Sequence, residues 1–284
     1  MLRPPGRART RTERNPVSSP AAFHASDGAA YEMWLGRWSS RLAPVFLDFA
    51  DFSQTGELLD VGCGTGALTF AMARRWSARR VTGVDLAPPY ILYAQSRRTG
   101  DQPSFEVGDA SALPLEDGRF AGVAAQLLFL FVPKPVIALR EMRRVTRPGG
   151  RVAAVVWDGR GGLVFQRMMW DTAVAIDPNA RVARDSLFAN PVAIPGGLAG
   201  FFHEAGLEDV ETGSLTIRMD YAGFEDYWQS FQTGQGPVGS YFANLALDLK
   251  ARLKEAVRDA YCSGAPDGPR SLAASTWAVR GKVP

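Results

Sequence analysis

The stretch ELLDVGCGTGALT at residues 57–69 decides the fold that this sequence predicts. A short apolar run over 58–61 breaks into a turn with glycines at 62, 64 and 66, and an amphipathic stretch continues from Ala67 to about Arg75. This order indicates a strand, a tight turn and a helix. Glycine suits such a turn because the backbone bends sharply and a ligand can approach it without meeting a Cβ atom. Turns of this kind are common, so its meaning depends on the strands that come after it in the chain.

Three further apolar runs each end in a polar side chain. In an open α/β sheet the carboxyl ends of parallel strands meet at one edge, where such sheets bind ligands. An acid at the end of the second strand can accept hydrogen bonds from both hydroxyls of a ribose. We therefore expect one ligand site beside the glycine turn. The runs are 80–84, 104–108 and 120–125, and they lead into Asp85, Asp109 and Gln126.

Several segments resemble, in order and in spacing, the successive motifs of class I S-adenosylmethionine-dependent methyltransferases. The resemblance covers roughly residues 55–160 and is closest to the small-molecule branch that includes the ubiquinone/menaquinone C-methyltransferases. A second resemblance, to a bacterial methyltransferase subgroup with a GRWS segment, covers YEMWLGRWSSRLAPVFLDF at 31–49. The four core segments are LLDVGCGTG (58–66), GVDLA (83–87), GDASALPLEDGRF (108–120) and LREMRRVTRPGGRVAAVVWD (139–158).

The resemblance implies a doubly wound, mostly parallel seven-stranded sheet, the Rossmann-like α/β fold of methyltransferases, with S-adenosyl-L-methionine as the cofactor. Its last two strands form an antiparallel pair, which we expect near 210–218 and 272–279. Residues 219–271 then form an insert far longer than a hairpin loop needs. The residues that we expect in the cofactor site are Tyr31, Arg37, Trp38, Asp60, Gly62, Cys63, Gly64, Gly66, Asp85, Leu86, Asp109, Ala110 and Gln126.

Some of these residues also have a purely structural interpretation. Asp60 can accept from the cofactor's amino group, which we favour, or from backbone N–H groups of the turn. Asp109 can accept from the adenine amino group or cap the turn next to it. Cys63 is a small side chain that suits packing inside the turn. Asp85 is the strongest candidate, because an acid that ends an apolar strand has little other reason to be there.

Two aromatic-rich segments flank this core. Residues 26–50 predict one or two helices with apolar side chains three or four residues apart, which either pack on the sheet or act as a lid that brings Tyr31, Arg37 or Trp38 to the ligand. The insert adds more aromatic residues and a helical stretch at 243–260. We expect these two segments to enclose an acceptor, with a plain hydrophobic core as the alternative. The aromatic residues are Trp34, Trp38 and Phe46, and Tyr227, Trp228, Phe231, Tyr241 and Phe242.

The basic charge of the sequence is concentrated at its start. Residues 1–14 hold five arginines and one glutamate, a net charge of +4, so the other residues carry about −1 of the total of +3. Nucleic-acid binding proteins usually place basic residues on the fold itself. Residues 1–20 hold four prolines and few large apolar residues, and we expect a disordered tail, with 21–284 as the methyltransferase domain.

The composition predicts a soluble globular protein, and the cytoplasm is its expected compartment. The chain is 46% hydrophobic and has no apolar run that approaches 18 residues, the length that a spanning helix needs. Its two cysteines, 63 and 262, give no disulfide framework or metal spacing, so a reducing compartment is expected. We expect no metal, no nucleic acid and no membrane among its partners, and a small-molecule acceptor.

Few residues suit acid–base chemistry. His24 precedes the first helix and is a weak candidate for a general base, whereas His203 lies beside two phenylalanines and suits packing. Asp158, Asp171 and Asp177 are carboxylates that could hold a metal only if they cluster.

Three functions remain open from the sequence. A methyltransferase acting on a small, largely apolar acceptor by in-line displacement fits the motifs best. A nicotinamide-dependent dehydrogenase would expect GxGxxG, whereas this turn is Gly62-x-Gly64-x-Gly66. A methyltransferase fold that binds the cofactor without catalysis is the third.

Overall fold

The structure is a computed structural model that describes residues 28–234 and 236–284. The predicted tail at 1–20 and His24 lie outside the described residues. No helix in the described part of the chain has the length and apolar character needed to cross a membrane.

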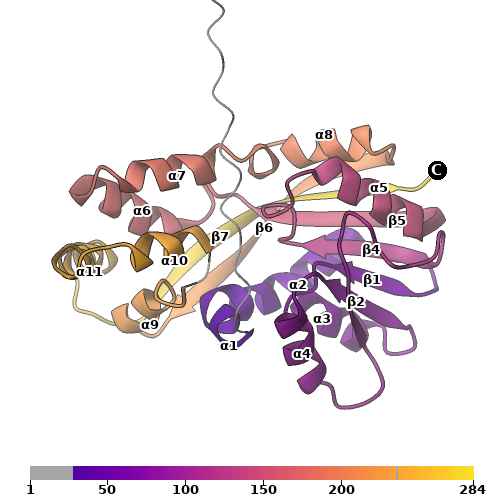
Figure 1. The fold of residues 1–284 in the computed structure, drawn as a ribbon, viewed down its shortest axis with the longest axis horizontal. Helices are drawn as coiled ribbons and strands as arrows, with labels where there is room; N and C mark the ends of the chain where they lie inside the picture. The colour runs from indigo at the N-terminus through magenta and orange to yellow at the C-terminus, as the bar shows by residue number, and fades with distance from the viewer. Residues whose placement is uncertain (1–27, 235) are drawn as a thin grey trace, which may run out of the picture.

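A seven-stranded sheet forms the centre of the molecule, in the order β3-β2-β1-β4-β5-β7-β6 (Figure 1). β7 runs antiparallel to both of its neighbours, and the remaining pairs are parallel. This confirms the predicted doubly wound, mostly parallel sheet with an antiparallel last pair. The strands are β1 (Leu58–Val61), β2 (Val81–Asp85), β3 (Ser104–Val107), β4 (Phe120–Gln126), β5 (Thr146–Trp157), β6 (Glu208–Tyr221) and β7 (Arg270–Lys282).

Helices cover both faces of this sheet (Figure 1). α2 and α3 lie on one face, and α5 and α8 on the other. The helices up to β6 are α1 (Gly28–Tyr31), the π-helix η1 (Glu32–Gly36), α2 (Arg37–Ala50), α3 (Ala67–Arg75), α4 (Pro88–Ser96), α5 (Pro135–Val145), α6 (Val164–Ile176), α7 (Ala180–Phe188), the 3-10 helix η2 (Pro191–Ala193) and α8 (Gly197–Glu204).

α2 is a packing helix over most of its length. Trp38, Leu42, Phe46 and Ala50 succeed one another at intervals of four residues, so they form one stripe on the helix. All four side chains are buried against the sheet and α3. α2 therefore acts mainly as a packing helix, with Ser39 as its contribution to the cavity at the glycine turn, whereas α1 and η1 lie over the turn itself.

β5 is irregular near its start. Residues 147–150 form a bulge inside the strand, because Phe120 pairs with Thr146 and Gly122 with Arg151. Gly149 supplies a φ of 73° within it, a left-handed conformation that glycine adopts without strain.

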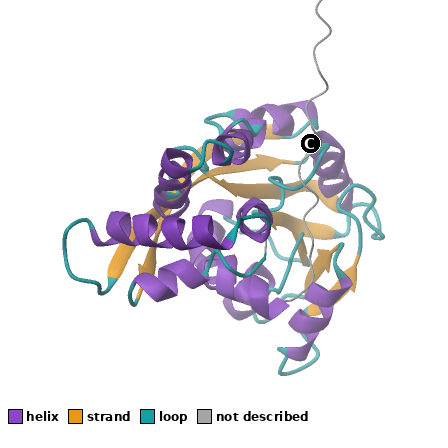
Figure 2. Cartoon of the chain, turned by 60° about the vertical axis from the view of Figure 1, so that its left-hand side comes forward, coloured by secondary structure: helices purple, strands orange, loops and turns teal. Residues whose placement is uncertain are grey.

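The predicted insert lies between β6 and β7 and folds into α9 (Phe224–Gln229), α10 (Gly236–Ala243) and α11 (Leu247–Cys262). The paired ends of β6 and β7 reach beyond the parallel strands, and helices pack beside them (Figure 2). The insert's aromatic side chains, which we expected around an acceptor, pack on one another and on α6 instead. Phe231 stacks on Phe165 with ring centroids 5.7 Å apart, and Trp228 meets Phe242 at 5.2 Å. These aromatics are core, which corrects the enclosure that we expected, because their rings fill the space between the insert and the sheet.

This core makes a direct prediction for Phe231, which is 1% exposed. Phe231→Ala should lower the free energy of unfolding by about 3–5 kcal/mol, because it deletes a ring from a packed cluster. Leu247→Ala is the matched control, because Leu247 belongs to the same insert and is 86% exposed; it should change stability by less than about 0.5 kcal/mol. Chemical denaturation of both variants measures the difference, and equal small effects would contradict the core assignment.

Candidate functional site

The site begins at the Gly turn (residues 62–66) between β1 and α3. Gly62, Gly64 and Gly66 have φ values of 71°, 53° and 93°, which L side chains rarely adopt. A Cβ atom on Gly62 would lie 2.6 Å from Leu128, whereas one on Gly64 would find its nearest neighbour, Tyr31, at 3.9 Å. The backbone at Gly64 is therefore less crowded than that at Gly62, with only the Tyr31 ring at van der Waals distance among the described residues.

Asp85 joins the end of β2 to this turn. Its Oδ2 accepts from the backbone N–H of Gly64 at 2.8 Å, and its Oδ1 accepts from the N–H of Ala87 at 2.9 Å. Burial raises the pKa of this carboxyl, while the two backbone N–H groups oppose that shift. Each carboxylate oxygen has two acceptor positions, so Asp85 supports the turn and keeps capacity for a ligand.

Asp60, the third residue of β1, is 1% exposed. Its Oδ2 accepts from the Thr69 hydroxyl at 2.6 Å, and its Oδ1 has no hydrogen-bond partner among the described residues. Burial raises the pKa of Asp60 to about 7, the Thr69 hydroxyl lowers it, and the nearby Asp85 raises it further. The expected alternative, a bond from Asp60 to the turn backbone, is replaced by the bond to Thr69.

Gln126 lies at the end of β4 with its amide inside the protein. Its Nε2 donates to the backbone carbonyl of Ser39 at 3.0 Å, and its Oε1 finds no partner within the described chain. Gln126 and Asp60 border one small cavity of about 20 Å³, which has the size of a single water site. The cavity is lined by Tyr31, Ser39, Asp60, Gly62, Cys63, Thr65, Ala67, Leu68 and Gln126.

The N-terminal segment closes this cavity. Tyr31 packs on Tyr90 of α4 with ring centroids 5.2 Å apart, and burial raises the pKa of the Tyr31 phenol to about 12. Glu32, the first residue of η1, accepts a hydrogen bond from the Thr65 hydroxyl of the Gly turn. α1 and η1 thus cover the turn that the sequence predicts as a ligand site.

Arg37 and Trp38 are not brought to this cavity. Arg37 forms an ion pair with Asp226 of α9 at 2.8 Å and lies over the Trp38 ring at 4.3 Å from its centroid. The Trp38 ring is buried and meets Tyr221 of β6 at 5.3 Å. Arg37 thus reaches α9, and Trp38 reaches the end of β6. Both partners are distant in sequence, so no local sequence pattern predicts these contacts.

An exposed apolar surface beside Asp85, which we call the shelf, is formed by Leu86 and Val107, and Asp109 and Ala110 follow Val107 in the chain. Leu86 is 67% exposed, and Val107, which pairs with Asp85 in the sheet, is 49% exposed. Asp109 accepts from the backbone N–H of Ser111 at 2.8 Å, which is the capping role that the sequence left open. Ala110 comes next and is half-buried. The shelf offers apolar contact next to the Gly turn.

The other polar candidates lie apart. His203 is exposed on α8, so the packing role expected from its phenylalanine neighbours is wrong: Phe202 is buried, and the next residue along the helix faces solvent. Asp158 accepts from the N–H groups of 160 and 161, Asp171 pairs with two arginines of α6 and α7, and Asp177 accepts from Tyr241. Among the described residues no group of three His, Cys, Asp or Glu side chains could hold a metal.

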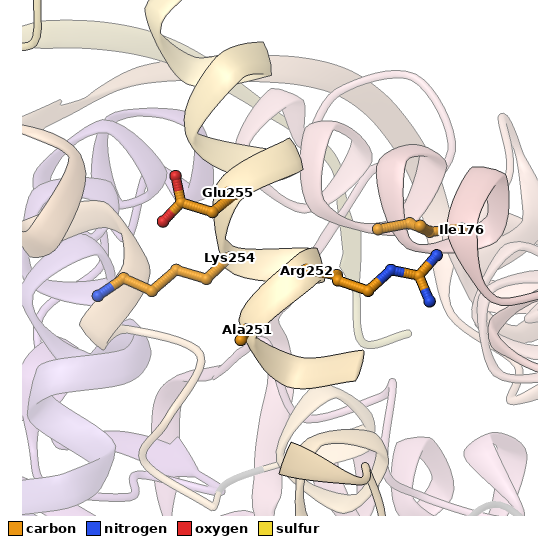
Figure 3. Close-up of a pocket in the computed structure, with 5 residues that line it drawn as sticks. All are labelled: Ile176, Ala251, Arg252, Lys254 and Glu255. Carbon is orange, nitrogen blue, oxygen red and sulfur yellow. The ribbon is translucent and has the colours of Figure 1, made fainter. Parts of the chain in front are cut away.

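A larger hollow, of about 560 Å³, lies on the surface between α6 and α11 (Figure 3). Ile176 and Arg252 lie on one side of it, while Lys254 reaches the other way and pairs with Glu225 at 2.7 Å. It holds none of the buried polar atoms that mark the cavity at the Gly turn. We therefore place the candidate site at the smaller cavity.

Several residues of the site are missing from the sequence-based set. Thr69 lies one helical turn beyond the Gly turn, so its position over Asp60 could have been inferred from helix geometry. Ser39, Glu32 and Arg97 come from other segments, and no local signal links them to the turn.

Residues 59–154 match the family model of the methyltransferase domain. An uncharacterized 37.1 kDa transposon protein of Streptomyces fradiae is 36% identical over 143 residues, which is 49% of this chain and 38% of that protein. The alignment therefore spans well under half of that relative's length.

Two solved structures share the fold. The phosphoethanolamine N-methyltransferase 2 of Haemonchus contortus, in complex with S-adenosyl-L-methionine, has a TM-score of 0.57 at 15% identity, covering 90% of this chain and 57% of its own. The geranyl diphosphate C-methyltransferase of Streptomyces coelicolor, in complex with S-adenosyl-L-homocysteine, has a TM-score of 0.50 at 17% identity, covering 91% and 85%.

The buried carboxyl makes a prediction about pH. Because its folded pKa of about 7 exceeds the ordinary value of 3.8, the stability that Asp60 contributes is full below 3.8 and is lost as the pH rises through 7. Asp60→Asn removes this dependence. Its free energy of unfolding, relative to wild type, should rise between about pH 4 and pH 8 by on the order of 4 kcal/mol.

Urea unfolding at several pH values measures this difference. Glu57→Gln is the control, because Glu57 forms a partly exposed ion pair with Arg119 just before β1. A difference between Asp60→Asn and wild type that stays constant with pH would show that Asp60 is ionised in the folded state throughout.

Proposed function

We propose that this chain, whose residues 59–154 match the methyltransferase domain, is a class I methyltransferase that transfers a methyl group from S-adenosyl-L-methionine to a small, largely apolar acceptor by in-line displacement. One observation carries the proposal. Asp60 Oδ1 and Gln126 Oε1 are buried acceptor atoms without partners among the described residues, and their side chains line the cavity at the Gly turn. Buried polar atoms are normally hydrogen-bonded, so this pair supports a ligand that carries donors.

The residues present fit this cofactor. Asp60 Oδ1 would accept from the amino group of its methionine part, and that cation would favour the ionised carboxylate. Asp85 has acceptor positions left for the ribose hydroxyls. The exposed shelf of Leu86 and Val107 offers an apolar surface to the adenine ring. At Gly64 the absent Cβ would let a ligand approach the backbone where the Tyr31 ring now lies at van der Waals distance.

The cofactor supplies an electrophilic methyl carbon on a positively charged sulfur. The chain's own contribution is to hold and orient the two reactants, because alignment accounts for much of the rate of such a displacement. Asp60 and Asp85 place two carboxyls beside the Gly turn, and their negative charge attracts a cationic ligand. Tyr31 and η1 cover the turn and keep water from it.

The acceptor must bring its own nucleophile. Among the described residues no histidine borders the cavity, and the Tyr31 phenol, with a pKa of about 12, stays protonated at neutral pH. These features support an acceptor that is already nucleophilic or easily deprotonated. The near-neutral charge outside residues 1–14 argues against a nucleic acid, whose binding depends on phosphate contacts. Because the sequence resembles the ubiquinone/menaquinone C-methyltransferases, we include quinols as one acceptor class in this proposal.

Cofactor binding tests the proposal first. Isothermal titration should show binding of S-adenosyl-L-methionine and none of NAD. Asp85→Ala should weaken that binding by about 1–3 kcal/mol, because it removes charged hydrogen bonds. Asp101→Ala, an exposed acid at the opposite end of the sheet, is the control and should bind as wild type does. Unchanged affinity in a folded Asp85→Ala protein would remove Asp85 from the site.

Turnover assays test the second part of the proposal, the class of acceptor. Transfer of labelled methyl groups to quinols, phenols and isoprenoids should exceed transfer to RNA. Methylation of RNA alone would contradict the acceptor class, and tight binding without turnover of any acceptor would favour a binding protein.

A further inference from the structure

Thr65 and Arg97 form a small anion-binding site beside the Gly turn, which we call the corner, and the Glu32 carboxylate occupies it. Its Oε1 accepts from the Thr65 hydroxyl at 2.5 Å and from the Arg97 guanidinium at 3.3 Å. Thr65 lies inside the Gly turn, and Arg97 comes directly after the end of α4. A hydroxyl and a guanidinium that converge on one carboxylate oxygen form a charge-assisted binding site.

This corner is held in place without Glu32. Arg97 also donates to the backbone carbonyl of Thr65 at 3.3 Å. Its guanidinium lies 5.3 Å from the ring centroid of Phe70 and 5.7 Å from that of Tyr93, at distances typical of cation–π contacts. Arg97 is therefore oriented by its surroundings, and the anion site would persist if the Glu32 carboxylate left.

Glu32 reaches the corner through an irregular backbone. It begins the π-helix η1, and its carboxyl folds back toward Gly36. A Cβ atom on Gly36 would lie 2.5 to 2.8 Å from the carboxyl atoms of Glu32, so a side chain there would expel the carboxylate. η1 and Gly36 together present a carboxylate to Thr65 and Arg97.

The corner adjoins the unsatisfied carboxyl of Asp60, since Thr65 and Asp60 line the same cavity. An α-amino acid group carries a carboxylate and an ammonium close together, and it would match an anion site beside an unpartnered carboxylate oxygen. We infer that Thr65 and Arg97 form the subsite for the carboxylate of the cofactor's methionine part, and that Glu32 is an internal placeholder which this carboxylate displaces. The inference rests on the proposed cofactor site.

The strength of the contact is consistent with displacement. The side chains of Arg97 and Glu32 are 40% and 22% exposed, and ion pairs of this exposure are weak. Removal of the placeholder should thus tighten binding of a carboxylate ligand by only about threefold to fivefold. Loss of Arg97 removes a charged hydrogen bond from the ligand itself and should weaken binding by about tenfold or more.

The experiment compares two ligands on several variants by isothermal titration. S-adenosylhomocysteine carries the amino-acid group, and 5′-methylthioadenosine lacks it. Glu32→Gln should bind S-adenosylhomocysteine more tightly and Arg97→Met more weakly, whereas the affinity for 5′-methylthioadenosine should stay within about twofold for both. In the double variant the gain from Glu32→Gln should disappear. Glu57→Gln and Arg98→Met repeat the charge changes elsewhere and should bind both ligands as wild type does.

Two results would overturn the inference while leaving the cofactor site intact: weaker or unchanged S-adenosylhomocysteine binding by Glu32→Gln, or equal losses of both ligands in a folded Arg97→Met. Failure of the wild type to bind either ligand would instead contradict the proposed function, and the inference with it.

Discussion

The hydrogen bonds of one carboxylate, Asp85, hold the site together. By accepting from Gly64 and from Ala87, this side chain fixes the Gly turn against the end of β2. The turn has three residues at positive φ, so it depends on such outside contacts more than a regular helix start does. Thr65 follows Gly64 directly, so its place in the turn depends on this connection, whereas Asp60 is held by the pairing of β1 and by Thr69.

This site places two acids, Asp60 and Asp85, close together in a largely buried place, which is unfavourable for stability. Burial raises the pKa of both Asp60 and Asp85, and the charge of Asp85 raises the pKa of Asp60 further. Thr69 stabilises Asp60 only in part, since one carboxylate oxygen has no partner among the described residues. Such a site is poor for stability and well suited to a cationic ligand. The contact of Glu32 is comparable, because its carboxylate accepts the hydrogen bonds of Arg97 and Thr65 in place of a ligand's anion.

The first four strands and the Gly turn could be predicted because their information is local. Apolar runs ending in Asp85 and Gln126 mark strand ends, and glycines mark a turn that other residues adopt only with strain. α7 was not predicted, since Ala180 is its one fully buried residue and its apolar stripe is short, with only Ala183 and Leu187 packing beside Ala180 on the core. Arg37 shows the other limit: its partner Asp226 is 189 residues away, and no spacing rule connects them. From the sequence, the aromatic residues of the insert could form either a hydrophobic core or the wall of a pocket. Their packing in the structure is what distinguishes the two.

The central claim is the place where the cofactor binds, and a crystal structure with S-adenosylhomocysteine tests it directly. We predict ligand density at the carboxyl ends of β1, β2 and β4, with the ligand's amino group within hydrogen-bond distance of Asp60 Oδ1 and with Glu32 moved away from Thr65. Ligand density elsewhere, such as the hollow between α6 and α11, with Asp60 Oδ1 still unpartnered, would contradict it.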